Sequence, residues 1–245
     1  MKKPFIIATV AVAALLLCTA AQSCRTVRKI RERKEQIQKI AEENKEYMHL
    51  EFMGLPMAGS STAFARSLKA RGFEEISDIQ KMTEMTGTVD GLPVEICLMR
   101  TPKTGLISRV ALFRPNRGTW SELEAEYLHL KDSLLALYPY PAIEEVFDSP
   151  FKKGDGKEIQ ALQQQMCTYE SDFYVNDDDV TIGIISVSIV GTEEDNSSRV
   201  MLLYLDIFNY DIECQEKGIK TFSDIDEDEP EAEPDSTESN NKPIQ

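Results

Sequence analysis

The chain of 245 residues carries 42 acidic and 27 basic residues, a net charge of −15, and 42% of its residues are hydrophobic. This apolar fraction is enough for a packed core in one large domain or two small halves. Neutralising phosphates requires clustered Lys and Arg, so the excess of acidic residues excludes sequence-independent binding of DNA or RNA. Two histidines leave little room for a histidine-rich metal site.

The N-terminus has the layout of an export signal. A basic Met-Lys-Lys start precedes an uncharged apolar run over 5–17, and small residues lead to Ala21. This pattern predicts a signal peptide over residues 1–21. Two other interpretations stay open: a lipoprotein signal up to residue 23 with lipidation of Cys24, or an uncleaved membrane anchor. We expect an exported protein, periplasmic or an outer-membrane or cell-surface lipoprotein, whose membrane contact is made through this segment.

The remaining chain separates into three zones of different charge. Residues 22–47 have a net charge of +3 and apolar residues near helical spacing, which predicts a basic helical stalk. Residues 223–245 contain nine acids and one lysine, and such a segment cannot bury enough apolar surface to offset its chain entropy. We therefore expect a disordered acidic tail after a folded domain over 48–222.

Two amphipathic helices are predicted in the domain. The first covers about 61–70 and ends near Gly72. The second covers about 119–137, begins at a capping box of Thr119 and Glu122, and stops at a Tyr-Pro-Tyr-Pro sequence that cannot continue a helix. Apolar residues every three or four positions give each helix one face for packing.

The segments between and after the helices read as β-strands joined by short turns. Asp90-Gly91 is a strong signal for a two-residue hairpin. Short links of this kind imply mostly antiparallel pairing. The predicted strands, besides short starts near 73–76 and 143–146, cover residues 81–89, 92–100, 106–113, 158–173, 180–190 and 199–208.

The element order predicts an internal duplication. A Pro-x-x-Gly-[Ser/Thr] motif starting at Pro56 and another starting at Pro115 each precede a helix. The order is β-α-ββββ-α-ββββ, with halves at about 48–105 and 106–222. We expect a two-layer α+β domain with a mostly antiparallel sheet and both helices on one face. Its layout is similar to tandem-repeat folds such as the β-lactamase-inhibitor protein or the TATA-binding protein, an analogy that carries no function.

Several stretches also resemble a known group of proteins. They are residues 50–56 with Gly59, 87–97, 108–115, 120–137, 167–169 and 200–205. On these stretches the chain resembles an uncharacterised family of small exported α+β proteins of gut Bacteroidota, which has no established activity. The resemblance implies a non-catalytic exported domain and supplies no functional residues.

The cysteines allow more than one interpretation. Cys97 and Cys167 both fall in predicted strands and are the preferred disulfide pair in an exported protein. Connectivity cannot be deduced from spacing, and free, buried cysteines are an equally good interpretation.

No residue pattern indicates catalysis or a cofactor. His49 and His129 have no second ligand at metal-site spacing, and Ser60-Ser61 reads as a helix cap rather than a nucleophile. The run Asp177 to Asp179 reads as a solvated turn, with a loose divalent-cation site as the alternative. No phosphate-binding loop or dinucleotide fingerprint is present in the sequence. We therefore assign no catalytic, metal or cofactor residues.

These observations favour a binding module for a protein or peptide partner in the cell envelope. The candidate contact spot is Phe113, Arg114 and Trp120, close together in the sequence. The alternatives are a carboxylate-dependent hydrolase and a purely structural envelope protein. A binding module requires an apolar surface patch, whereas the hydrolase requires a deep pocket with acids of perturbed pKa.

Overall fold

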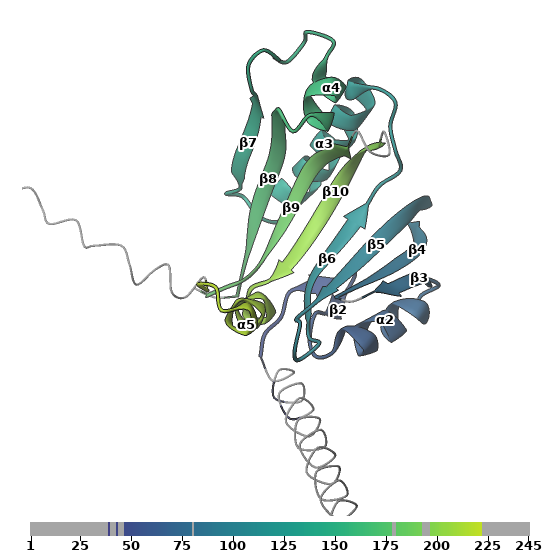
Figure 1. The fold of residues 1–245 in the computed structure, drawn as a ribbon, viewed down its shortest axis with the longest axis vertical. Coiled ribbons are helices and arrows are strands. Elements are labelled where there is room, and N and C mark those ends of the chain that lie inside the picture. The colour runs from purple at the N-terminus through teal and green to yellow at the C-terminus, as the bar shows by residue number, and fades with distance from the viewer. Residues whose placement is uncertain are drawn as a thin grey trace, which may run out of the picture.

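The fold is described from a computed structural model of the chain. Within the residues described, it is an α+β fold with two sheets and four helices (Figure 1). None of these helices is long and apolar enough to cross a membrane. The predicted signal segment, the acidic tail and nearly all of the basic stalk lie outside the described residues. Those residues are 47–79, 81–177, 180–192 and 197–221, together with Lys39 and Glu43.

Along the chain, groups of strands are separated by single helices. In chain order they are β1 (Glu51–Phe52), β2 (Leu55–Pro56), α2 (Ser61–Lys69), β3 (Glu74–Ile79), β4 (Met82–Val89), β5 (Leu92–Arg100), β6 (Ile107–Phe113), α3 (Trp120–Leu135), β7 (Ala142–Phe147), α4 (Glu158–Gln163), β8 (Cys167–Asp177), β9 (Val180–Thr192), β10 (Ser197–Asp206) and α5 (Ile207–Lys217).

The large sheet has eight strands in the order β3-β4-β5-β6-β10-β9-β8-β7. Every neighbouring pair is antiparallel, which confirms the expected mostly antiparallel α+β class. The Asp90-Gly91 turn joins β4 to β5 as predicted, with Val89 paired to Leu92. The first four strands meet the last four only where β6 pairs with β10.

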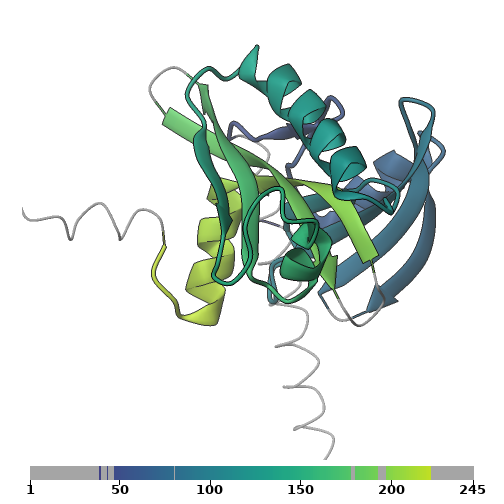
Figure 2. The same ribbon diagram turned by 90° about the horizontal axis from the view of Figure 1, so that it is seen from above.

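One face of the large sheet, the packed face, carries the hydrophobic core. Cross-strand pairing aligns Ile96, Leu112, Leu202 and Val187 on this face, and all four side chains are buried. The β1-β2 hairpin, α2 and α3 contribute to the same core cluster, and Leu162 of α4 joins it at one end of the sheet. Figure 2 shows α3 lying along this side of the strands. The expectation of two helices on one face is confirmed for α2 and α3.

The opposite side of the large sheet, the open face, is covered by α5 at one end. Arg109 points to this face because it alternates with the buried Val110. Its guanidinium bonds Glu213 of α5 at 2.8 Å and lies 5.3 Å from the ring centre of Tyr210. Helix α5 therefore sits on the open face where β6 begins.

The helix starts agree with the sequence signals. The Ser60 side chain accepts a hydrogen bond from the Ala63 N–H and caps α2. The Thr119 hydroxyl accepts from the Glu122 N–H at 3.3 Å and donates to the Glu122 carboxylate at 2.8 Å. The predicted box is therefore present in a variant form, in which the glutamate bonds the threonine hydroxyl.

Two of the strand predictions are wrong in part. Residues 158–163 form helix α4 rather than the start of a strand, since Glu158, Ala161 and Leu162 share one buried face at helical spacing. The predicted strand over 199–208 ends at Asp206, where α5 begins. Neither α4 nor α5 has a long apolar repeat, so tertiary packing decides the conformation of both segments.

A buried carboxylate, Asp206, connects three parts of the fold. It caps α5 by accepting from the Asn209 N–H at 2.9 Å, and it also accepts from the Leu50 N–H at 3.0 Å. His49 donates from Nδ1 at 2.9 Å, and both side chains are almost completely buried. The Asn209 amide donates in turn to the carbonyls of Met57 and Ile107. Residues 49–57, the start of β6 and α5 are thereby held together.

Replacing Asp206 tests this connection. We expect Asp206→Ala to lower the free energy of unfolding by about 3–5 kcal/mol, because it leaves several buried donors without an acceptor. Asp206→Asn keeps an oxygen acceptor and should cost less. Urea denaturation followed by circular dichroism measures both, with exposed Asp132→Ala on α3 as the matched control. A loss for Asp206→Ala no larger than the control's would contradict the assignment.

Candidate functional site

Two of the three residues of the predicted contact spot, Phe113 and Arg114, line one depression in the structure, and Trp120 does not line it. Phe113 faces the open face, with the Arg199 guanidinium 4.3 Å from its ring centre. Arg114 is held by Glu126, to which its Nε donates at 2.9 Å. Trp120 is half-buried against the core, and its ring lies 5.1 Å from that of Tyr169. Phe113 and Arg114 remain neighbours, but Trp120 cannot join them at one surface.

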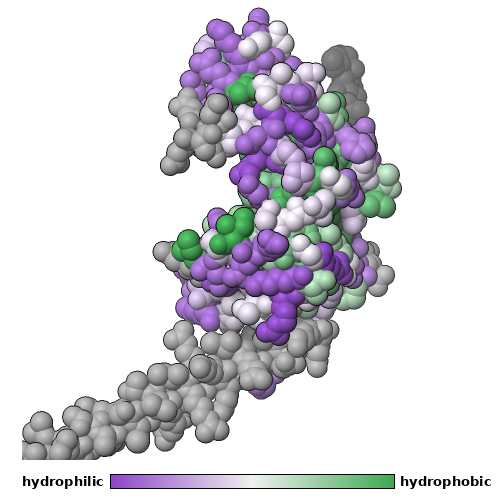
Figure 3. Space-filling view, turned by 90° about the vertical axis from the view of Figure 1, so that its right-hand side faces the viewer, coloured by the Kyte–Doolittle hydropathy of each residue, from purple (hydrophilic) through white to green (hydrophobic). Residues whose placement is uncertain are grey.

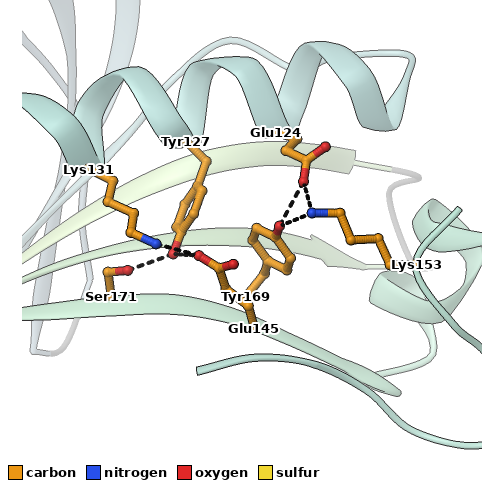
Figure 4. Close-up of polar contacts among 7 residues, drawn as sticks. All are labelled: Glu124, Tyr127, Lys131, Glu145, Lys153, Tyr169 and Ser171. Atoms are coloured by element: carbon orange, nitrogen blue, oxygen red, sulfur yellow. Dashed lines mark hydrogen bonds and ion pairs between the residues drawn. The ribbon is translucent and has the colours of Figure 1, made fainter. Parts of the chain in front are cut away.

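Tyr169, the neighbour of Trp120, belongs to a polar network between α3 and strands β7 and β8 (Figure 4). The Tyr127 hydroxyl hydrogen-bonds the Ser171 hydroxyl at 2.6 Å and donates to Glu145 at 3.1 Å. Lys131 also bonds Glu145, at 2.5 Å. Nearby, Glu124 accepts from the Tyr169 hydroxyl at 2.7 Å and from Lys153 at 2.6 Å.

The electrostatics of this network are those of a structural cluster. Burial raises the pKa of Tyr169 to about 12 and that of Tyr127 well above its usual range. The bond from Lys153 lowers the pKa of Glu124 against the opposing effect of burial. For Glu145, burial is outweighed by the bonds from Lys131 and Tyr127, so the pKa is also lowered. General acid–base catalysis needs a pKa near the working pH, and these groups are moved away from it. The network holds α3 on the sheet.

The predicted Cys97–Cys167 disulfide is wrong for this fold. Both cysteines are free, Cys97 on β5 and Cys167 on β8. Three strands lie between β5 and β8, which separates these two strands by about 19 Å at the usual strand spacing. A disulfide requires Cα atoms within about 7 Å. Burial raises the pKa of both thiols, that of Cys167 to about 11, so neither is an activated nucleophile.

The other residues considered for chemistry have local structural roles or lie apart. His49 belongs to the Asp206 connection, and His129 is exposed on α3. Of the Asp177–Asp179 run only Asp177 is described, at the end of β8. Across the described residues, no group of three or more His, Cys, Asp or Glu side chains is placed to hold a metal ion.

The open face carries the arrangement that sequence reasoning could not assemble. Its centre is a band of mostly apolar side chains from β5, β6 and β10, which we call the central band. Ala111 is buried and the others are half-buried. Cross-strand pairing places them in two adjacent rows. The central band consists of Cys97, Ala111, Phe113, Met201 and Leu203.

Carboxylates flank the central band on both sides, and we call them the acidic wings. One wing is Glu84 and Glu95 on β4 and β5, the other Glu144, Glu170 and Asp172 on β7 and β8. The strand register puts them in line with the band. The first row reads Glu84, Cys97, Ala111, Leu203, Ser186, Asp172. The second row reads Glu95, Phe113, Met201, Ser188, Glu170, Glu144.

At one end the central band meets a depression of about 170 Å³. Phe113 and Arg114 line it together with Glu95 and Arg199, which form an ion pair at 2.5 Å. Figure 3 shows a hollow at mid-height of the molecule, between an upper and a lower lobe. The open face is therefore neither flat nor uniformly polar.

The wing on β7 and β8 holds carboxylates in mutual repulsion. Glu144 lies directly opposite Glu170 in the strand register, and Asp172 is next along β8 on the same face. Burial raises the pKa of Glu170, and the neighbouring charge of Asp172 raises it further. The Ser186 hydroxyl donates to Asp172. A cationic side chain of a partner would relieve this repulsion.

Glutamine at position 170 tests the repulsion. The pKa of Glu170 is higher in the folded chain than in the unfolded chain, where it is near 4.5. Protonated Glu170 therefore favours the fold at pH values below 4.5, and this contribution to stability is lost as the pH rises through the pKa of the folded chain. We therefore expect Glu170→Gln to have a higher urea midpoint than the parent at pH 7, with the difference disappearing near pH 4. Exposed Glu51→Gln on β1 is the control. An unchanged difference across this range would contradict the prediction.

Neither a protein-family model, nor a curated protein, nor a solved structure matches this chain.

Proposed function

We propose that this protein is a non-catalytic interaction module that binds a basic, amphipathic segment of a partner protein on its open face. The observation that carries the proposal is the central band of apolar side chains between two acidic wings. An apolar stripe flanked by Lys or Arg on the partner complements this pattern in both hydrophobicity and charge. The net acidity of the chain attracts such a segment from a distance.

The two parts of the surface contribute differently to binding. Phe113, Met201 and Leu203 are half-buried, so a partner that covers them removes further apolar area from water, at about 25 cal/mol per Å². The wings steer encounter and fix orientation, and their contribution weakens as salt screens it. Affinity for the partner is therefore expected to fall with ionic strength without disappearing.

The two alternatives from the sequence have less support. The carboxylates that a hydrolase would use, Glu144, Glu170 and Asp172, line a depression of about 310 Å³ together with Ala142 and Ile143 at the sheet edge. A general acid there would work beside open solvent rather than in an enclosed pocket. A purely structural envelope protein would gain nothing from the like-charge repulsion between Glu144 and Glu170.

We also propose that the domain arose by internal duplication. The strand order supports it, because β3 to β6 and β7 to β10 each form a four-stranded group after a helix, and their last strands pair at the centre. In this arrangement the boundary between the two repeats lies after β6, between Phe113 and Trp120, rather than near residue 105. The layout resembles the tandem-repeat folds named above, as an analogy of architecture.

We propose further that the chain is exported, with cleavage after Ala21. The tripartite pattern of residues 1–21 supports this. Mass spectrometry of the protein from its native envelope is expected to find Gln22 as the first residue. A lipid-modified Cys24 at the N-terminus would establish the lipoprotein instead, and an intact Met1 would establish the anchor.

Charge reversal on the wings tests the interaction module. The probe is a synthetic 18-residue helical peptide with a leucine stripe flanked by lysines, titrated by fluorescence anisotropy at low salt. We expect Glu84→Lys combined with Glu170→Lys to weaken binding by about tenfold, which is 1.4 kcal/mol. The matched control, Glu51→Lys with Asp132→Lys, changes the net charge equally but lies away from the open face.

The central band has its own variant in the same assay. Met201→Glu should weaken binding by a similar or larger factor, because it puts a negative charge into the apolar stripe. Circular dichroism and urea denaturation confirm that each variant is folded. Equal weakening by the control pair, or no binding of the peptide to the parent protein, would refute the proposal.

A further inference from the structure

A second surface feature lies at the end of the sheet, away from the central band. We call it the tyrosine groove, a depression of about 480 Å³. After α3 ends, the chain passes the end of β8 before β7 begins at Ala142, which pairs with Asp172. The segment that passes β8 supplies one wall and the end of the β8-β9 hairpin supplies the other. The lining residues are Leu137, Tyr138, Pro139, Tyr140, Tyr174, Asn176 and Thr181.

The groove exposes large apolar side chains that the domain could have buried. Tyr140 is 88% exposed, Leu137 69% and Tyr174 45%. Pro139 and Pro141 flank Tyr140, so the backbone that carries its side chain is restricted before a ligand arrives. Tyrosine side chains also lose little conformational entropy on binding. The wall is therefore preorganised to contact a flat apolar ligand surface.

Several polar groups of the groove can donate hydrogen bonds to a ligand. The Thr181 hydroxyl donates to Oδ1 of Asn176 at 2.8 Å, which fixes the carbonyl end of that amide and leaves its amide nitrogen as the donating end. The hydroxyls of Tyr138, Tyr140 and Tyr174 can also donate. A ligand with unpaired carbonyl groups and apolar rings matches this set. A polyproline II helix is such a ligand, because its carbonyls have no internal partners and prolines have no N–H.

The charge beside the groove specifies the ligand further. The groove residue Asn176 is followed by Asp177, the last residue of β8. A peptide with Arg or Lys next to its prolines is attracted to this carboxylate. The chain's own tail over 223–245 contains prolines but has a net charge of −8, so it is repelled.

We propose that the tyrosine groove is a docking site for a proline-rich segment of a partner protein that carries basic residues beside its prolines. The segment binds in the polyproline II conformation, with prolines against Tyr140 and Tyr174 and carbonyls on the Asn176 amide and the tyrosine hydroxyls. This site borders the open face, because Tyr174 follows Asp172 on the same side of β8, but it does not depend on the function proposed for the central band.

A set of labelled peptides tests this site on the full chain. The first is a twelve-residue peptide with two Pro-Pro pairs followed by two arginines, and fluorescence anisotropy measures its affinity. We expect replacement of its prolines by alanine, or of its arginines by glutamate, to weaken binding by about tenfold. On the protein, Tyr140→Ala and Tyr174→Ala should each have a similar effect. Tyr47→Ala, an exposed tyrosine outside the groove, should not.

Two further arms separate this proposal from its rivals. The Met201→Glu protein should keep its affinity for the proline-rich peptide, and a loss there would assign that binding to the central band. Cellohexaose tests an oligosaccharide, the rival ligand for exposed tyrosines. Sugar binding that Tyr140→Ala abolishes, without peptide binding, would overturn the proposal, as would equal affinity for the proline and alanine peptides.

Discussion

The antiparallel pairing of β6 with β10 is the constraint on which the architecture depends. It connects residues about 90 positions apart, since Leu112 lies opposite Leu202 and Val110 opposite Tyr204. Without this pair the first four strands and the last four would form separate sheets, each with two edges and half a core. Two side chains hold the junction in place. The Asn209 amide donates to the carbonyl of Ile107 at the start of β6, and the Asp206 carboxylate at the end of β10 accepts from the Asn209 N–H. The central band lies across this junction.

The polar groups of the domain fall into two classes with different consequences. Asp206, Glu124, Glu145 and Glu213 are satisfied by partners from distant segments, and they order the packing of helices on the sheet. The carboxylates of the β7-β8 wing are arranged against each other instead. Buried or half-buried like charges raise the free energy of the unbound protein. This cost at Glu170, together with the central band, supports the proposal that the open face, rather than the tyrosine-rich network under α3, binds a partner.

Sequence signals of short range were sufficient for part of the fold. The capping residues Ser60 and Thr119, the apolar repeat of α3 and the Asp90-Gly91 turn act within a few residues, so each element could be predicted from its own segment. Helices α4 and α5 could not, because their apolar repeats are short and Asp206 acts on residues more than 150 positions away. The position of α5 depends on Arg109 and Ser108 of β6, which no local pattern relates to Glu213.

The sequence by itself determined the α+β class, the antiparallel hairpins, helices α2 and α3, and the acidic character of the folded part. Only the tertiary structure decided which residues share a surface, because strand order and register are set by long-range pairing. Cys97 and Cys167 are similar in sequence context, yet three strands lie between the strands that carry them. Phe113 and Trp120 are seven residues apart, yet Phe113 lies on the open face and Trp120 packs against the core beside Tyr169. The central band and its acidic wings combine residues from six strands, and only the folded sheet brings them together.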